Sequence, residues 1–296
     1  MISKTAMITI CGRPNVGKST LTNALAGEKI AIVSNKPQTT RNRITAVCQR
    51  GETQFVFLDT PGFHKPRTRL GDYMVNVVRQ SVADVDAVVL VVEPVASLGP
   101  QERELIASIK AANCPAVLAI NKLDTVEPEK LLAVIALYSE AYAFNAIVPI
   151  SAKTGDGVEE LLKELDKFAV ESPALFPEGV TTDQPEKQVC AELIREKLLL
   201  NLEREVPHGT AVEITRFSER DDGIIDLEAT IYCEKASHKG IIIGKNGAML
   251  KKISTEARRD IERFMGTKVY LETWVKVKEN WRDNMNYIRN FGYDEQ

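Results

Sequence analysis

The chain has 296 residues, of which 44% are hydrophobic and 27% are charged, and its formal net charge is -3. These values describe a soluble globular protein that is long enough for two ordinary domains with separate cores. They exclude a chain that is basic throughout, so any contact with nucleic acid must come from a local basic patch.

The five cysteines predict buried, reduced thiols, because they are scattered and no pair has the spacing of metal ligands. They are Cys11, Cys48, Cys114, Cys190 and Cys233. The start of the sequence lacks a signal-peptide pattern, and no apolar run is long enough to span a bilayer. The expected compartment is the cytosol.

Between residues 6 and 170, short apolar runs alternate with longer amphipathic ones. Strands are predicted at residues 6–11, 44–50, 53–58, 87–93, 116–120 and 146–150. Helices are predicted at residues 19–27, 73–82, 101–112, 128–143 and 158–170. This pattern predicts an α/β domain with a doubly wound, mostly parallel sheet, in which ligands bind at the carboxyl ends of the strands.

The first strand is followed by a glycine-rich segment that is typical of a phosphate clamp. Its glycines allow backbone N–H groups to surround a phosphate, and the next helix directs its positive end at the same anion. Lys18 would reach the β- and γ-phosphates, and the Ser19 hydroxyl would hold Mg²⁺. The predicted binding residues are Gly12, Arg13, Pro14, Asn15, Val16, Gly17, Lys18, Ser19 and Thr20.

A second motif, Asp59-Thr60-Pro61-Gly62, directly follows a strand. Asp59 would orient Mg²⁺ through its water shell, and the Gly62 N–H would approach the γ-phosphate; a simple turn or helix cap is the alternative. In the preceding loop, Thr40 would complete the Mg²⁺ shell only while a γ-phosphate is present. Thr39 is the alternative to Thr40, and spacing does not separate them.

A third motif, Asn121-Lys122-Leu123-Asp124, follows the strand at residues 116–120. The Asp124 carboxylate can accept both N1–H and N2–H of guanine, whereas adenine would leave it unpaired. Asn121 would reach the base edge, and the Lys122 stem would cover the ring. Backbone N–H groups near guanine O6 would come from Ser151, Ala152 and Lys153.

After residue 171 the periodicity breaks, and a second domain follows. We predict a first domain over residues 1–171, a proline-containing linker over 172–187, a second domain over 188–282 and a tail over 283–296. The second domain should contain a helix at 188–205, strands at 209–219 and 224–235, a helix at 248–265 and a strand at 268–278. Trp274 is predicted to lie in the core. Trp281 and Tyr287 either stack on a base or pack against the domain.

The segment around Gly244-Lys245-Asn246-Gly247 is typical of a loop that clamps a sugar-phosphate backbone, beside an aliphatic groove for unstacked bases. Twelve basic and five acidic residues give residues 235–282 a net charge of +7. This local charge favours phosphate contacts; a solvated helix face with ion pairs is the alternative. The predicted RNA contacts are Ile243, Gly244, Lys245, Asn246, Gly247, Lys251, Lys252 and Arg258.

Together these motifs resemble the translation-factor-like GTPases and, within them, the Era family. The resemblance implies a P-loop GTPase domain followed by a small α+β KH domain, with GTP or GDP and Mg²⁺ as ligands. It further implies binding of 16S rRNA near its 3′ end, a role in maturing the small (30S) ribosomal subunit, and peripheral association with the inner face of the cell membrane. It identifies no obligate protein partner.

One position departs from the Ras-like pattern. Phe63 stands where Ras-like GTPases carry the glutamine that orients the attacking water, so we predict slow intrinsic hydrolysis that depends on positioning and charge. Lys18, Thr40 and Gly62 are the predicted catalytic residues. His64 invites a general-base role, but a loop histidine is the simpler interpretation. In related GTPases an asparagine at the position of Asn15 helps to hold K⁺; capping the turn is the alternative.

Two other classes of function also fit parts of the sequence. A membrane-surface switch would use the basic patch on anionic lipid, but it would not need the glycine loop. A tRNA-modifying GTPase would need a second catalytic constellation, which the sequence does not contain.

Overall fold

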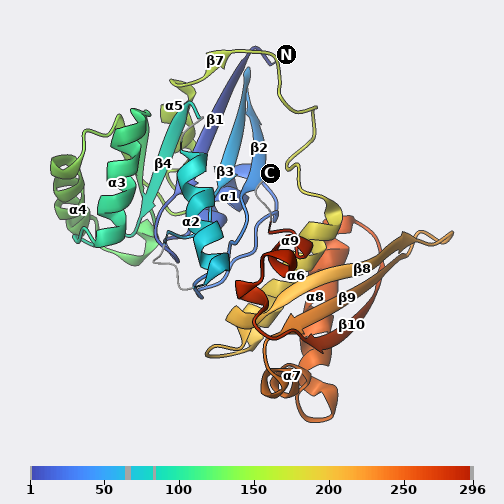
Figure 1. Cartoon of the computed structure of the whole chain (residues 1–296). Helices are drawn as coiled ribbons and strands as arrows, with labels where there is room; N and C mark the ends of the chain where they lie inside the picture. The colour runs from blue at the N-terminus through green and yellow to red at the C-terminus, as the bar shows by residue number, and fades with distance from the viewer. Residues whose placement is uncertain (1, 64–67, 83–84, 294–296) are drawn as a thin grey trace. The chain divides into compact units, whose positions relative to one another are not determined.

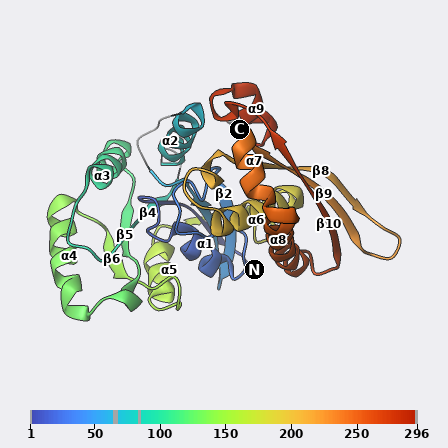
Figure 2. The same cartoon turned by 90° about the horizontal axis from the view of Figure 1, so that it is seen from below.

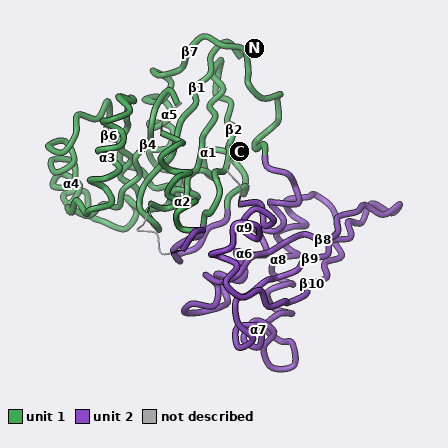
Figure 3. The backbone as a smooth tube through the Cα atoms, in the orientation of Figure 1, with its two compact units in different colours: residues 1–31, 40–66, 71–183 green, residues 32–39, 67–70, 184–296 purple. Residues whose placement is uncertain are grey.

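The computed structural model describes residues 2–63, 68–82 and 85–293. The chain divides into two compact units (Figure 3). The first comprises residues 1–31, 40–66 and 71–183, and the second comprises residues 32–39, 67–70 and 184–296.

The first unit is built on one sheet with the strand order β2-β3-β1-β4-β5-β6, and β7 pairs with β1 (Figure 1). The strands are β1 (Lys4–Cys11), β2 (Ile44–Arg50), β3 (Thr53–Asp59), β4 (Ala87–Val92), β5 (Ala116–Ile120), β6 (Ala146–Pro149) and β7 (Val170–Glu171). β2 runs antiparallel to β3 and β7 antiparallel to β1, whereas the pairs along β3-β1-β4-β5-β6 are parallel. The predicted mostly parallel sheet is confirmed.

Helices cover both faces of this sheet, as Figure 2 shows. They are α1 (Lys18–Ala26), α2 (Arg69–Ser81), α3 (Pro100–Ala112), α4 (Pro128–Ala141) and α5 (Val158–Asp166), with a short 3₁₀ turn, η1 (Leu123–Thr125). Successive residues of β4 point to opposite faces. Val89 packs with the core under α1 and α5, and Leu90 packs with the core under α2, α3 and α4. The apolar strands are therefore buried on both sides, as the doubly wound prediction requires.

The second unit has a three-stranded sheet in the order β10-β9-β8. Its elements are α6 (Glu186–Asn201), η2 (Pro207–Gly209), β8 (Ala211–Glu219), β9 (Ile225–Cys233), α7 (Ala236–Ile243), η3 (Lys245–Gly247), α8 (Ala248–Met265), β10 (Val269–Val277), η4 (Trp281–Asp283) and α9 (Met285–Asn290). β8 and β9 are antiparallel, β9 and β10 are parallel, and α6 and α8 share one apolar core with the sheet. The predicted α+β order of helix, strand, strand, helix and strand is present, and the structure adds helix α7 before the glycine loop.

The prediction for Trp274 is wrong, because this side chain is 58% exposed. The two helices cover one face of the sheet, and side chains alternate along β10, so Val275 is buried and Trp274 faces the other way. Trp281, in contrast, is fully buried and its Nε1 donates to the Gly209 carbonyl at 2.9 Å. Of the two predictions for Trp281, packing against the domain is confirmed.

Residues 172–183 belong to the first unit. The buried Gln54 side chain accepts hydrogen bonds from the backbone N–H groups of Leu175 and Phe176, at 2.8 and 2.9 Å, and donates to the Phe176 carbonyl at 2.9 Å. Further along, the Val47 N–H donates to the Thr181 carbonyl at 2.7 Å. This segment is therefore tied to β2 and β3 by its backbone.

Candidate nucleotide and RNA sites

The glycine-rich segment joins β1 to α1 in a backbone conformation that two of its glycines make accessible. Gly12 and Gly17 have φ angles of 155° and 99°. A Cβ at Gly12 would lie 2.4 Å from the Val91 carbonyl oxygen, and one at Gly17 would lie 2.2 Å from Asn121 Nδ2. A side chain at either position would be both strained and sterically blocked. The segment therefore brings its backbone close to β4 and to the residue that follows β5.

Lys18 and Asp59 bring opposite charges into the interior beside this segment. The Lys18 ammonium donates to the carbonyls of Gly12 and Arg13, at 3.2 and 2.9 Å. Burial lowers the pKa of Lys18, and the nearby Asp59 carboxylate opposes that shift. Burial raises the pKa of Asp59 to about 6, and the Lys18 charge opposes this rise.

Ser19 and Thr40 place their hydroxyl oxygens 2.7 Å apart. Thr39 Oγ1 instead contacts Ser34 Oγ at 2.7 Å and donates to the Lys36 carbonyl at 2.6 Å. Within the described part of the chain, neither carboxylate oxygen of Asp59 has a hydrogen bond of ordinary geometry, although polar groups of Ser19, Thr22 and Thr60 oppose the rise of its pKa. Hydroxyl and carboxylate oxygens are donors of the kind that Mg²⁺ prefers, so Ser19, Thr40 and Asp59 fit the ion.

The residues after β3 lie against the phosphate-clamp segment. The buried Thr60 hydroxyl donates to the Ile10 carbonyl at 2.8 Å, and the Phe63 N–H donates to the Gly12 carbonyl at 3.2 Å. A Cβ at Gly62 would lie 2.8 Å from Pro14 Cα, so this contact requires glycine. The Phe63 ring is buried in the apolar core that includes residues of α2. His64 lies outside the described residues.

The residues after β5 and β6 are hydrogen-bonded to each other. Asn121 Nδ2 donates to the Val16 carbonyl at 2.8 Å, and Asn121 Oδ1 accepts from the Ala152 N–H at 2.9 Å. The Ser151 hydroxyl donates to Asp124 Oδ1 at 2.7 Å. Asn121 thus ties the clamp to the loop after β6, while Lys153 is exposed.

Two carboxylates that the motifs did not reveal also contact this region. Glu93 forms ion pairs with both Arg13 and Lys122, and the buried Glu102 forms one with Arg13. Glu93 directly follows β4, so its place at a strand end was the available signal. Its two ion pairs connect the phosphate-clamp segment with the motif after β5.

In the second unit, a tight loop connects α7 to α8. Gly244, Asn246 and Gly247 all have positive φ angles, of 72°, 51° and 77°. A Cβ at Gly244 would lie 2.7 Å from Met249 Cβ, whereas one at Gly247 would meet nothing within 4 Å. Lys245 and Asn246 are exposed at the tip of the loop, and Ile243 is half-buried just before it.

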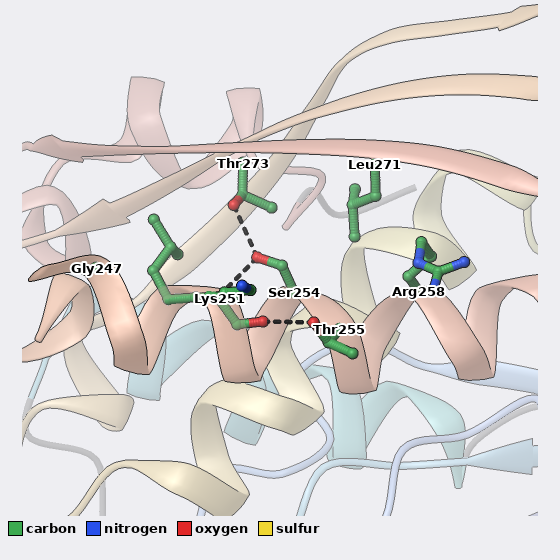
Figure 4. Close-up of a pocket in the computed structure, with 8 residues that line it drawn as sticks. Gly247, Lys251, Ser254, Thr255, Arg258, Leu271 and Thr273 are labelled. Atoms are coloured by element: carbon green, nitrogen blue, oxygen red, sulfur yellow. Dashed lines mark hydrogen bonds between the residues drawn. The ribbon is translucent and has the colours of Figure 1, made fainter.

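A groove of about 370 Å³ starts at this loop and runs between α8 and β10 (Figure 4). Its lining residues are Gly247, Leu250, Lys251, Ser254, Thr255, Arg258, Leu271 and Thr273. Ser254 Oγ and Thr273 Oγ1, 2.8 Å apart, join its two walls. Lys251 and Arg258 contribute positive charge, although Arg258 also pairs with Glu262 at 2.7 Å. Lys252 is exposed and does not line the groove.

Comparisons with known proteins agree with both halves of this description. The model of the 50S ribosome-binding GTPase family matches residues 7–122, and the KH domain model matches residues 205–282. GTPase Era of Ruminiclostridium cellulolyticum is 52% identical over 293 residues, which cover 99% of this chain and 98% of that protein. This chain belongs to the Era GTPase family. GTPase Era of Clostridium kluyveri is 50% identical over 290 residues, covering 98% and 99% of the two chains.

Solved Era structures have the same fold along nearly the whole chain. A point variant of Aquifex aeolicus Era bound to GDP·AlF₄⁻ superposes with a TM-score of 0.95 at 37% identity, covering 99% of this chain and 100% of that one. Era in complex with MgGDPNP and nucleotides 1506–1542 of 16S ribosomal RNA gives the same values. The predicted family, the two-part fold and GTPase activity are therefore confirmed: the chain is an Era GTPase with a C-terminal KH domain.

Proposed function

We propose that this GTPase binds 16S rRNA near its 3′ end and acts in maturation of the small (30S) ribosomal subunit. The observation that carries the proposal is the glycine loop between α7 and α8, which opens onto a groove with two basic side chains. The Era structure that contains nucleotides 1506–1542 of 16S ribosomal RNA supports the choice of RNA.

For the nucleotide, Lys18 would contact the β- and γ-phosphates from its position over the clamp carbonyls. Ser19 and Thr40 would ligate Mg²⁺, and Asp59 would act through a metal-bound water. Their arrangement supports Thr40 over Thr39, because Thr40 is the threonine that contacts Ser19. Mg²⁺ supplies positive charge beside the phosphates.

Guanine selection would come from Asp124, whose carboxylate Ser151 already orients by a hydrogen bond. Guanine O6 would accept from backbone N–H groups of Ser151, Ala152 and Lys153, a loop that Asn121 fixes by accepting from the Ala152 N–H. The Lys122 stem would cover the ring. Adenine would leave the Asp124 carboxylate unpaired.

For hydrolysis, we propose that the chain uses positioning and charge rather than a side-chain base, because the buried Phe63 ring cannot hydrogen-bond water. Asn15 is exposed and has a φ of 66°, a conformation that asparagine tolerates in turns. This geometry supports the turn interpretation, and K⁺ binding by Asn15 remains the alternative. Equal rates of hydrolysis in KCl and NaCl would exclude a role for K⁺.

For the RNA, the N–H groups of the loop and Lys245 would bind the sugar-phosphate backbone. Leu250 and Leu271 would contact unstacked bases in the groove, while Lys251 and Arg258 would neutralise phosphates. These contacts require RNA that is unpaired, because a paired base cannot enter such a groove.

The test compares Gly247→Asp with Gly223→Asp. Both glycines have φ of 77° and nothing within 4 Å of an added Cβ, but Gly223 lies in the turn between β8 and β9. We expect Gly247→Asp to weaken binding of a labelled RNA with the sequence of 16S nucleotides 1506–1542 by at least about tenfold (~1.4 kcal/mol) in fluorescence anisotropy. Gly223→Asp should bind like the wild type. Equal affinity of the two variants would contradict the proposal.

We further propose that the protein works in the cytoplasm, with a peripheral contact at the inner membrane face that uses the basic residues of 235–282. Among the described helices, none is long and apolar enough to cross a membrane. Sedimentation with anionic vesicles tests the contact, and Gly247→Asp should largely spare it because lipid attraction needs only charge. Absence of wild-type sedimentation at low salt would rule it out.

A further inference from the structure

Residues 32–39 belong to the second unit, whereas the next residue, Thr40, belongs to the first. They are held there by helix α6. The Arg195 side chain is fully buried, and its guanidinium donates to two successive backbone carbonyls, those of Gln38 at 3.2 Å and of Thr39. Glu192, one turn earlier in α6, accepts from Arg195 Nε at 2.8 Å and compensates the charge.

Other contacts fix the same segment along its length. Lys36 Nζ donates to the carbonyls of Leu199 and Leu202, at the C-terminal end of α6. The Val33 N–H donates to Glu196 Oε1 at 2.9 Å, and Ile32 is part of the apolar core of the unit. Side chains of α6 bind the backbone of the segment, and the Lys36 side chain of the segment binds the backbone of α6. These hydrogen bonds add to the apolar packing.

The backbone that Arg195 holds is not a relaxed one. Gln38 has a φ of 60°, which costs a non-glycine residue on the order of 1 kcal/mol and persists only where the surroundings enforce it. A planar guanidinium that binds two successive carbonyls sets the orientation of both peptide groups. An aliphatic side chain at position 195 would pack in the same place without the cost of taking a charge out of water. The stability of α6 therefore does not require the buried pair of Arg195 and Glu192.

Thr40 is joined to this segment by one peptide bond, and its hydroxyl lies 2.7 Å from Ser19 Oγ in the first unit. We propose that Arg195 is a positioning residue for GTP hydrolysis, which fixes the Gln38 and Thr39 carbonyls and thereby presents the Thr40 hydroxyl at the magnesium end of the nucleotide site. This inference rests on the proposed role of Thr40. The influence of Arg195 on the reaction would pass through the backbone of Gln38 and Thr39.

The first test uses protein without nucleotide. In Arg195→Met, the two carbonyls lose their donors, so hydrogen exchange at the amides of residues 33–40 should become at least tenfold faster. Arg216→Met is the control, because Arg216 is 57% exposed on β8 and contacts acidic side chains of β9 only through weak surface pairs. Exchange that is unchanged in Arg195→Met would overturn the inference.

The second test measures the reaction. Arg195→Met should lower kcat about tenfold and raise the Mg²⁺ concentration for half-maximal hydrolysis, while its affinity for GDP stays within twofold of the wild type. A general loss of structure would also weaken the binding of GDP. A lower kcat with unchanged GDP affinity therefore indicates a positioning role and not a loss of stability. Arg195→Lys keeps the charge but lacks the planar guanidinium. Its kcat and its Mg²⁺ requirement should therefore lie between those of the wild type and of Arg195→Met. Hydrolysis equal to that of Arg216→Met would overturn the inference.

Two further variants keep the inference testable if Arg195→Met does not fold. Lys36→Met leaves α6 intact and removes donors from the loop itself. Like Arg195→Met, it should raise both the rate of amide hydrogen exchange and the Mg²⁺ requirement. Thr40→Ala tests the role on which the inference rests. If Thr40→Ala leaves the Mg²⁺ requirement unchanged, the proposed role of Thr40 is wrong; if it raises the requirement and the variants of Arg195 and Lys36 do not, the inference about Arg195 alone fails.

Discussion

Asp59 is a buried acid whose pKa rises to about 6, because burial penalises its charged form. A raised pKa means that the folded state disfavours the carboxylate. The stability that the protonated group contributes is present below its ordinary pKa near 4 and is lost as the pH rises through about 6. The nucleotide-free protein therefore keeps, at neutral pH, a destabilising charge at the position proposed for Mg²⁺.

We predict that Asp59→Asn makes the nucleotide-free protein relatively more stable as the pH rises. The difference in unfolding free energy between variant and wild type should grow in favour of the variant by up to about 3 kcal/mol between pH 4 and pH 7.5. Urea unfolding at both pH values measures it. A difference that does not change with pH would show that the Asp59 carboxyl titrates normally.

Phe63 is expected to act through packing and not through chemistry. Phe63→Leu should keep the rate of GTP hydrolysis within about tenfold, a difference of ~1.4 kcal/mol in the barrier, and should mainly lower Tm. The ring is buried among apolar residues of α2 and the sheet, which explains the expected loss of stability. A much larger loss of rate, with GTP affinity intact, would contradict this account.

For single residues, the sequence predicted the places of the motifs along the chain better than it predicted the directions in which side chains point. Asp59, Asn121 and Asp124 were predicted because their motifs stand at strand ends, and the structure places the motifs there. The distinction between Thr39 and Thr40 depends on which hydroxyl faces Ser19, and sequence spacing does not contain that information. The orientation of Trp274 was missed because a two-residue period does not reveal which face the helices cover.

Among the elements, residues 172–183 after β7 are bound more firmly than their two prolines suggest. Gln54 is fully buried on β3 and makes three hydrogen bonds with the backbone of Leu175 and Phe176. Removing the amide would delete all three hydrogen bonds, at a cost of about 1 kcal/mol each, because Leu175 is 51% exposed and water can reach the N–H groups that lose their acceptor.

We predict that Gln54→Ala lowers the unfolding free energy by about 2–4 kcal/mol and makes residues 172–183 sensitive to protease. Gln49→Ala on β2 is the comparison, because Gln49 is only half-buried. Limited proteolysis followed by mass spectrometry locates the cuts. If both variants resist protease equally, the amide of Gln54 does not hold this segment.

Element order was largely predictable, because alternating apolar runs and amphipathic runs leave few topologies for a parallel sheet. The ends of the elements were harder to predict. The helix predicted at residues 158–170 ends at Asp166, and Val170 pairs with Thr5 of β1 instead. A long-range strand pair of this kind leaves no local pattern in the sequence.

For the whole molecule, the central claim is that a guanine nucleotide site and an RNA-binding KH domain act in one protein on the small-subunit rRNA. The family and the fold establish that both parts are present. The glycine loop and the groove beside it are the features that would select the RNA.

The most direct measurement is crosslinking of the full chain to RNA in cells, followed by sequencing of the RNA that is bound. The account predicts reads concentrated near the 3′ end of 16S rRNA in the wild type and strongly reduced in Gly247→Asp, with Gly223→Asp like the wild type. Reads that are spread over unrelated transcripts or tRNA, or that do not change in Gly247→Asp, would contradict it.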